Sequence, residues 1–464
     1  MKEYPVVIIG AGPAGLTAAY ELVKRGIPPI VLEKSNQVGG LARTETYKGY
    51  RFDIGGHRFF TKTEEVQNSW REMLKEDFLR VPRLSRIHHQ GKFFHYPLNL
   101  SNVLSHLGIV ESLTILFSYG MAAIHPYPEE KTLEQWVINR FGSRLYKTFF
   151  KAYTEKVWGI PCDRIQADWA AQRIKGLSLI SAVSNALYRN DGVKTLVHEF
   201  HYPVYGTGMM WQRFQKIVES LDGEVCLETE VVGLKCEDDR IKSIVARKNG
   251  RFIEVPGDHY LSTIPLVELI TCLDPPPPEE VLRAAQSLFY RDLILIGLIV
   301  DHPNLFPDQW IYIHSPQVKV SRIQNFKNWS IGMVPDPMKT SLGMEYFCTE
   351  GDGLWMRSDP ELVDLATREL IHLGLAKEGE VKEGVVFRQC KAYPVYDRDY
   401  RKNLEMIRQF LKDIENLQSI GRNGMHRYNN QDHSMLTAMF AVKNLLGENH
   451  DLWGVNVDPS YYEN

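Results

Sequence analysis

Short apolar runs separated by a glycine-rich turn open the chain. Residues 6–9 form a β-branched run that ends at Gly10, as expected for a buried parallel strand. Residues 14–23 contain no helix breaker and have helical character. A second apolar run, residues 29–32, ends at Glu33. The pattern predicts a strand–turn–helix–strand unit with an acid at the tip of its second strand.

The turn in this unit has the spacing G-x-G-x-x-G. Gly10 permits the tight turn, Gly12 lets the backbone approach a diphosphate, and Gly15 lets the helix pack on the strand. The helix start offers unpaired N–H groups and the positive end of a dipole to that anion, and Glu33 can accept hydrogen bonds from a ribose. An empty glycine-rich turn is the alternative, but it leaves Glu33 unexplained. The predicted dinucleotide contacts in this unit are Gly10, Gly12, Pro13, Ala14, Gly15, Glu33 and Lys34.

Apolar periodicity also predicts elements farther along the chain. Residues 83–97 suggest a hairpin turning at Gln90-Gly91, and Thr132 to Gln135 reads as a capping box that starts a helix. The apolar run 107–124 is interrupted by polar residues, which favours a core helix over a membrane span. Strand-like runs at 293–300 and 343–348 follow a proline-rich connector and predict an antiparallel sheet.

These elements predict an α/β protein. Its Rossmann-like dinucleotide-binding domain is discontinuous and carries a helical insertion, and a second domain contains an antiparallel substrate sheet. The expected boundaries are 1–80, 196–265 and 411–464 for the dinucleotide domain, 81–195 for the helical insertion and 266–410 for the substrate domain.

Bulk properties narrow the function classes. The 464 residues are 44% hydrophobic and 24% charged, with a net charge of −3, which gives no reason to expect nucleic acid or an anionic membrane as partner. The six cysteines are scattered without a C-x-x-C pair, so neither a disulfide framework nor a metal site is predicted. The first strand starts within a few residues of the N-terminus, which leads us to expect no signal peptide and a cytoplasmic enzyme.

The segment after Glu33 carries a family resemblance. Residues 39–43 read Gly-Gly-Leu-Ala-Arg, and this G-G-x-x-R segment resembles FAD-binding flavoproteins that include amine oxidases, protoporphyrinogen oxidase and UDP-galactopyranose mutase. The resemblance implies that the dinucleotide is FAD. It also implies that Gly40, Leu41 and the guanidinium of Arg43 contact the diphosphate, although a solvated surface arginine is the plain alternative.

Further segments match the pyranose mutases within this group. Gly55-Gly56-His57 matches a loop that lies against the flavin, and a looser loop at 206–208 corresponds to one beside the isoalloxazine. The position near Val232 contacts adenine through its backbone in the group. Residues 419–434 resemble the eukaryotic-type mutases closely. The FAD contacts implied by these matches are Gly55, Gly56, His57, Val232, Gly421, Arg422, Asn430, Gln431 and Ser434.

The same resemblance assigns substrate residues. The Y-T-x-K-x-W motif ends at Trp158, for which a buried core indole is an equal alternative. Arg173 and Arg322 correspond to arginines that hold the nucleotide diphosphate in the mutases. A guanidinium suits this role because it can bind phosphate in bidentate fashion. A solvated helix arginine is the alternative for Arg173. The remaining implied substrate contacts are Asn325, Tyr393, Tyr396 and Tyr428.

The resemblance implies a flavin-dependent mutase that interconverts pyranose and furanose forms of a nucleotide-linked sugar, with N5 of reduced FAD attacking the anomeric carbon. The catalytic set would be His57, Arg173, Arg322, Tyr393 and Tyr428, with NADPH or NADH as reductant. The alternatives are an FAD-dependent oxidoreductase of the amine oxidase type and a nonenzymatic flavin protein, because fold does not fix function. His426 departs from the aromatic residue that is common in mutases. The sugar, its base and any homo-oligomer are left open.

Overall fold

Strand β1 (Tyr4–Ile9) lies at the centre of the larger sheet in the structure, a computed structural model that describes residues 4–96, 98, 100–167 and 199–456. It pairs in parallel with β2 (Ile30–Leu32) on one side and with the C-terminal half of β12 (Arg251–Ser262) on the other. β9 (Glu224–Cys226) and β19 (Leu417–Ser419) extend this parallel core at its two edges. The predicted strand–turn–helix–strand unit is therefore the nucleus of the fold.

Both faces of this parallel core are covered, which explains why β1 is apolar at successive positions. Val6 and Ile8 pack against one helical layer, and Val7 and Ile9 pack against the opposite one. The first layer contains α1 (Pro13–Val23), α2 (Glu64–Leu74), α9 (Gly208–Ser220) and α15 (Gln431–Leu445). The second contains α10 (Leu266–Thr271), α11 (Glu279–Gln286) and α14 (Tyr400–Lys412).

An antiparallel extension widens the same sheet to eight strands. β11 (Arg240–Lys248) pairs with the first half of β12, β10 (Thr229–Glu237) pairs with β11, and β13 (Leu273–Asp274) joins β10 in parallel. β11 and β12 form a hairpin across Asn249-Gly250, with positive φ at both residues. β9 and β10 are separate strands, because the chain turns between them at Glu228, where φ is +52°.

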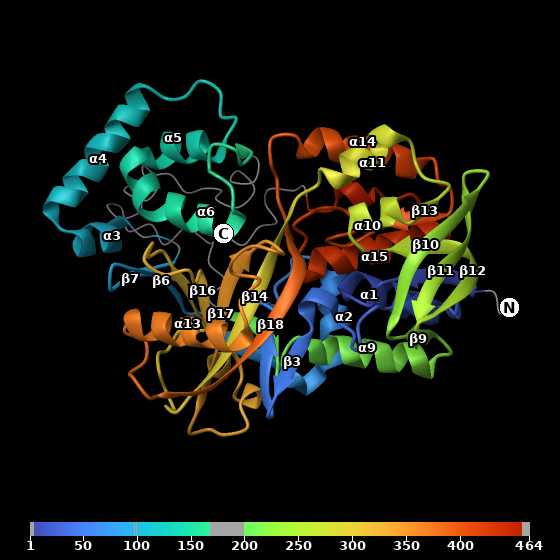
Figure 1. Ribbon diagram of the computed structural model, residues 1–464, viewed down its shortest axis with the longest axis horizontal. Helices are drawn as coiled ribbons and strands as arrows, with labels where there is room; N and C mark the ends of the chain where they lie inside the picture. Colours follow the sequence, from blue (N-terminus) through green and yellow to red (C-terminus); the bar gives the residue numbers. More distant parts are fainter. Residues whose placement is uncertain (1–3, 97, 99, 168–198, 457–464) are drawn as a thin grey trace.

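A second, seven-stranded sheet lies beside the first (Figure 1). Its order is β18-β14-β17-β16-β15-β6-β7, and all pairs are antiparallel except β15 with β6. The strands are β6 (Ser85–His89), β7 (Lys92–His95), β14 (Tyr290–Val300), β15 (Trp310–Ile313), β16 (Arg322–Asn325), β17 (Thr340–Cys348) and β18 (Val381–Pro394). Helix α13 (Asp359–His372) packs on one face, where it buries Ile294 and Ile296 of β14.

A helical layer covers part of this sheet. It contains α3 (Leu100–Leu107), α4 (Ile109–Ile124), α5 (Leu133–Leu145), the π-helical turn Tyr146–Lys151 and α6 (Ala152–Trp158). The capping box at Thr132 and Gln135 is present, and so is the hairpin turning at Gln90-Gly91. That hairpin falls within the expected helical insertion, yet its strands β6 and β7 belong to the seven-stranded sheet.

Short elements complete the described chain. The strands are β3 (Thr44–Tyr47), β4 (Tyr50–Asp53), β5 (Phe78–Pro82) and β8 (Glu199–Pro203). The helices are α12 (Phe326–Trp329) and the 3₁₀ turns Gly40–Ala42, Lys75–Asp77, Ile331–Met333 and Leu452–Gly454. The mixed α/β fold class predicted from the sequence is confirmed.

One helix departs from its prediction. The apolar run 107–124 was expected to form a core helix, but in α4 only Ile115 and Ala122 are buried, while most of its large apolar side chains are exposed. Within the described ranges, no helix is both long and apolar enough to cross a bilayer.

Candidate active site

A cavity of about 1100 Å³ runs between the two sheets and collects most of the predicted site residues. Its volume suits a large ligand such as a dinucleotide, with room for a second molecule. The predicted residues that line it are Gly10, Gly12, Pro13, Ala14, Glu33, Lys34, Gly40, Leu41, Arg43, Gly55, Gly56, His57, Arg322, Tyr393, Gly421, Arg422, Tyr428, Asn430, Gln431 and Ser434.

The turn after β1 forms one end of the cavity. Gly10 has a φ of +98°, and a Cβ there would lie 2.2 Å from Thr263 Oγ1, so only glycine fits. A Cβ on Gly15 would lie 1.9 Å from the Gly10 carbonyl oxygen, which explains why α1 and β1 pack so closely. Gly12 and Gly40 face each other, because a Cβ on Gly40 would lie 3.2 Å from Gly12 Cα.

Glu33 is held at the tip of β2 by backbone N–H groups. Ala11 N donates to Glu33 Oε2 at 2.7 Å, and Ser35 N donates to Oε1 at 2.9 Å. The carboxylate is buried yet lines the cavity. These two bonds orient it and leave lone pairs for a ligand's hydroxyl groups.

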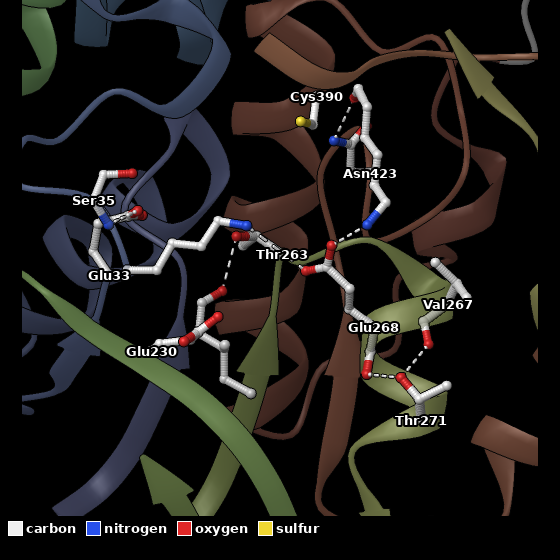
Figure 2. A network of polar contacts seen from close by, with 12 residues as sticks. Glu33, Ser35, Glu230, Thr263, Val267, Glu268, Thr271, Cys390 and Asn423 are labelled. Carbon is white, nitrogen blue, oxygen red and sulfur yellow. Dashed lines mark hydrogen bonds and ion pairs between the residues drawn. The ribbon is translucent and has the colours of Figure 1, made fainter. Parts of the chain in front are cut away.

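Charged side chains bridge the segments at this end of the cavity (Figure 2). Glu268 of α10 pairs with Lys391 of β18, and its second oxygen lies 4.0 Å from Lys34 Nζ. Asn423 donates to the Lys391 carbonyl oxygen at 2.9 Å. Four segments that are distant in sequence are thereby joined next to Glu33.

Arg43 lies farther along the cavity, where the two sheets meet. Its Nε donates to Glu45 at 2.6 Å, and Nη1 donates to the Gly40 carbonyl at 3.0 Å and to Gln389 at 2.5 Å. The carboxylate of Glu45 balances its charge. The guanidinium therefore fixes the 3₁₀ turn at Gly40 relative to β18, while remaining part of the cavity wall.

The loop at Gly55–His57 forms the middle of the cavity wall. His57 Nε2 lies 3.0 Å from both the Leu41 and the Ile54 carbonyl oxygens, so this nitrogen carries the proton and Nδ1 is an acceptor. Burial lowers the pKa of His57 to about 4, and the nearby Arg422 charge adds to the shift. The imidazole is therefore neutral at physiological pH.

Arg322, which lines the cavity, forms an ion pair with Glu345, so the pair carries no net charge. Arg322 Nε donates to Glu345 Oε2 at 2.7 Å, and Nη2 donates to the Tyr393 hydroxyl at 2.6 Å. Burial alone would lower the pKa of Arg322, but the Glu345 carboxylate outweighs it and holds that pKa well above its usual value. Gln324 also donates to Glu345, which has no exposed surface.

Tyr393 is set up as a hydrogen-bond donor. Burial raises its pKa to about 12, although the Arg322 charge opposes the shift, so the phenol is neutral. Because its oxygen already accepts from Arg322, its own proton is free to be donated to a ligand. Tyr428 lies next to it, with ring centroids 5.5 Å apart.

Arg422 stacks on this aromatic pair, with its guanidinium 4.0 Å from the Tyr428 ring centroid. It donates to the Ala392 carbonyl at 3.0 Å and to the Asn429 carbonyl at 3.1 Å. None of the described carboxylates forms an ion pair with it. Arg422 thus adds an unbalanced positive charge to this wall.

Several predicted residues lie outside the cavity wall. Trp158 is buried, with its ring 6.3 Å from Tyr393 and 6.2 Å from Tyr428, so it supports both phenols from behind. The Tyr396 hydroxyl accepts from Tyr428 N at 2.8 Å, and the Asn325 side chain donates to the Phe306 carbonyl at 3.3 Å.

Val232 and Arg173 are the two remaining predicted positions. Val232 lies at a bulge between Val231 and Gly233, which turns it outward and leaves Val231 facing the cavity. Arg173 lies outside the described residues.

The glycine loop at 206–208 supports the cavity wall from behind. Thr207 Oγ1 donates to the Ala42 carbonyl at 2.9 Å, and Thr207 N donates to the buried Asp53 carboxylate at 3.2 Å. Tyr202 and Thr44 donate to the same carboxylate at 2.5 and 2.6 Å. Burial raises the pKa of Asp53 to about 6, against the effect of these hydrogen bonds.

The sequence interpretation missed several residues of this site. Glu345 is the one charged residue of strand β17, and that isolation was the available signal. Trp310 packs on Gly56, where a Cβ would lie 2.4 Å from its indole ring. Tyr96 and Tyr312 line the cavity with ring centroids 4.4 Å apart. Nothing in their local sequence marked these aromatic residues.

The residues present fit FAD. The facing glycines Gly12 and Gly40 leave an open passage for a diphosphate, and the first turns of α1 and α15 both line the cavity. Glu33 is oriented for a ribose. Within the described ranges, no cluster of histidine, cysteine or acidic side chains is arranged to hold a metal ion.

Comparison with known proteins agrees with this geometry. The fold superposes on a crystal structure of reduced UDP-galactopyranose mutase with a TM-score of 0.86 at 22% identity, covering 99% of this chain and 97% of the other, which establishes a shared fold.

Two sequence relatives match at low identity. A probable UDP-galactopyranose mutase from Klebsiella pneumoniae is 25% identical over 178 residues, 36% of this chain and 44% of that protein. A 15-cis-phytoene desaturase from an Oncidium hybrid cultivar is 25% identical over 401 residues, 80% of this chain and 65% of that protein. The matches thus span less than two thirds of either relative.

The family model for flavin-containing amine oxidoreductases matches residues 13–401, which is most of the chain. The resemblance inferred from the glycine motifs is thereby confirmed. The chain belongs to the flavin-containing amine oxidoreductase family and is an FAD-dependent enzyme of the amine oxidase superfamily.

Proposed function

We propose that this flavoenzyme is a mutase that interconverts the pyranose and furanose forms of a nucleotide-linked sugar. The observation that carries the proposal is the wall made by Arg322, Tyr393 and Tyr428, which faces the same cavity as the Gly55–His57 loop. A guanidinium and phenol hydroxyl groups suit the oxygens of a diphosphate. An oxidase of apolar substrates has no use for such a wall.

The cavity residues fit the needs of the reaction. When bound and reduced, FAD supplies a nucleophilic nitrogen for the anomeric carbon of the sugar, and NADPH or NADH supplies the electrons beforehand. The diphosphate must stay bound while it leaves the sugar, because it has to return to the same carbon. Arg322 and the hydroxyl of Tyr393 would stabilise the growing negative charge in a largely buried cleft.

The charge of the wall supports an anionic ligand but does not fully balance a diphosphate. Glu345 neutralises Arg322, so Arg422 supplies the net positive charge of this wall. The sequence offers Arg173 as a further cation. Neutral His57 leaves an acceptor, Nδ1, beside the Gly55-Gly56 backbone, and we propose that this group orients the flavin.

The part of the cavity lined by Tyr96 and Tyr312 favours a flat chemical group. The rings of Tyr96 and Tyr312 meet at an angle of 32°, and Trp310 lies 5.5 Å from Tyr312, with the Arg58 guanidinium over the Trp310 ring. An aromatic nucleobase would stack on such a surface. We therefore propose that the nucleoside lies there, with its diphosphate at Arg322 and its sugar toward His57.

The test is a panel of nucleotide sugars, with UDP-galactose first, incubated with protein reduced by dithionite. The proposal expects a product of unchanged mass and altered chromatographic retention for at least one donor. Arg322→Lys is the matched variant, since it keeps the charge and loses the bidentate fork. Conversion of no donor by the reduced wild-type protein, together with oxidation of an amine or polyene by the oxidised form, would favour the oxidoreductase alternative.

A further inference from the structure

The Y-T-x-K-x-W motif contains a lysine that does not line the cavity. Lys156 lies close before Trp158 in the last turn of α6, and its side chain reaches the turn between β15 and β16. We call residues 314–321 the β15–β16 turn. This turn leads directly into Arg322, whose guanidinium belongs to the substrate wall. The lysine of the motif is therefore a candidate for a role in building that wall.

The Lys156 ammonium donates hydrogen bonds to three backbone carbonyl groups at the two ends of this turn. Its Nζ lies 3.3 Å from the Ile313 oxygen, 3.1 Å from the Ser315 oxygen and 3.0 Å from the Val320 oxygen. An ammonium has three N–H bonds, so each of them can have one acceptor here. The side chain thus ties both ends of the β15–β16 turn to α6.

A buried carboxylate holds the same turn through its N–H groups. Glu369 of α13 is 7% exposed, and its oxygens accept from Lys319 N at 2.6 Å and from Val320 N at 2.9 Å. The Tyr346 hydroxyl donates to the same carboxylate at 3.0 Å. Val320 is therefore held at both of its backbone polar groups, the N–H by an anion and the carbonyl by a cation.

The two charges also act on each other across the Val320 backbone. Burial lowers the pKa of Lys156 to about 8, and the Glu369 charge opposes that shift, so the ammonium persists at neutral pH. Buried charges are costly unless they are paired or hydrogen-bonded. Here the backbone of one turn satisfies both of them, which makes the position of this turn depend on both side chains.

Lys156 and Glu369 come from helices on opposite faces of the seven-stranded sheet (Figure 1). Val157 of α6 belongs to the core cluster that contains Leu293 of β14, whereas α13 packs in the cluster that contains Ile294. Successive residues of a strand point to opposite faces of its sheet. The β15–β16 turn is therefore fixed between the two layers that cover this sheet.

The position of the turn determines where Arg322 begins its strand. Ile313 N donates to the Ser321 carbonyl at 2.9 Å, and Ser321 N donates to the Glu345 carbonyl at 2.9 Å. Arg322 follows at once and donates from Nε to the Glu345 carboxylate. A shift of Val320 would thus be passed through one residue to the guanidinium.

The other end of the Lys156 contact leads to the two phenols of the wall. Trp158 lies on the same helical turn as Lys156, and its ring supports Tyr393 and Tyr428 from behind. Lys156 therefore connects the strand that carries Arg322 with the helix that supports the phenols.

We propose that Lys156 and Glu369 are positioning residues of the substrate wall, which hold the β15–β16 turn so that Arg322 meets the diphosphate. This inference rests on the proposed function, in which the wall binds a nucleoside diphosphate. Neither side chain touches the ligand; both act through the backbone of Val320. Losing either contact would let β16 move relative to α6, and small displacements of a binding group are costly.

Hydrogen exchange of the FAD-loaded full-length protein tests these contacts without any substrate. Lys156→Met keeps an unbranched side chain and removes the ammonium, so we expect amide exchange in the β15–β16 turn to become at least about tenfold faster. Lys327→Met is the matched control, because Lys327 likewise donates to backbone carbonyls, those of Pro303 and Pro337. This control should leave exchange in the turn unchanged.

Calorimetric titration with UDP tests the positioning role. We expect the Kd for UDP to rise about 10- to 100-fold in Lys156→Met at unchanged FAD content. Glu369→Gln should act in the same direction, and it serves as the second variant if Lys156→Met does not fold. Lys156→Arg keeps a charged donor and should stay within about threefold of the wild type. Lys327→Met should bind UDP like the wild type.

The outcomes separate this inference from the proposed function. Unchanged exchange in the turn of both Lys156→Met and Glu369→Gln would overturn the inference, and so would faster exchange with an unchanged Kd for UDP. A wild type that binds no UDP would contradict the proposed function instead. Exchange alone would then decide: acceleration that extends into residues 322–325 supports the inference, and acceleration confined to residues 314–321 overturns it.

Discussion

Replacing Glu345 by glutamine isolates the ion pair on the substrate wall. Glu345 has no exposed surface, and its carboxylate accepts two hydrogen bonds, from Arg322 Nε and from Gln324. Breaking a buried pair by removing one partner costs about 3–5 kcal/mol, because the other charge stays behind. Glutamine keeps one acceptor oxygen, so we expect a loss of about 2–4 kcal/mol in the free energy of unfolding.

A double-mutant cycle makes this prediction specific. Arg322→Met combined with Glu345→Gln removes both charges, and we expect it to be more stable than Glu345→Gln alone. Glu254→Gln is the control, since Glu254 pairs with Lys235 on the surface and should show no measurable change. Urea unfolding followed by tryptophan fluorescence measures each stability, and absorbance at 450 nm reports FAD content.

Two outcomes would refute this reasoning. Equal stability of Glu345→Gln and the wild type would mean that Arg322 has no need of its carboxylate partner. A double variant that is less stable than Glu345→Gln would mean that Arg322 stabilises the wall without the pair. Either result would remove the physical basis for a preoriented guanidinium at the substrate wall.

Three other predictions address the remaining parts of the cavity. Tyr393→Phe should keep FAD and lower turnover about 10- to 100-fold, because one hydrogen bond to a charged group is lost; unchanged turnover would rule out its role as donor. Gly12→Val should fold, since a Cβ there meets only Gly40 Cα at 3.9 Å, but should lack the yellow cofactor; normal FAD content would exclude the diphosphate from this gap. The free energy of unfolding should fall as pH drops from 6.5 to about 4, by at most the amount per pH unit that one bound proton contributes, because His57 is then protonated in the unfolded chain and not in the folded one. Urea titrations of His57→Gln should lack this contribution.

The cofactor end of the site was predictable because its signals are local. Gly10, Gly12, Gly15 and Glu33 act within one strand–turn–helix–strand unit, so their spacing alone determines what they can bind. The adenine contact expected near Val232 stays a prediction; a bulge in β10 turns the Val232 side chain outward and leaves Val231 lining the cavity.

The substrate wall was only partly predictable, because it depends on sheet register. Arg322 meets Glu345 since β16 and β17 pair with these residues opposite each other, and no local pattern fixes that register. The sequence likewise did not predict which side of α4 is exposed. An apolar run specifies that a surface must be covered, but it does not specify whether the covering comes from the same chain.

A mutase of the kind proposed here catalyses an isomerisation with no net redox change. The most direct test is to count NADPH or NADH consumed per product formed, under anaerobic conditions and with the nucleotide sugar that reacts. We expect prereduced protein to turn over many times without further reductant and oxidised protein to be inactive. One nicotinamide consumed for each product would contradict the mutase proposal and identify an oxidoreductase.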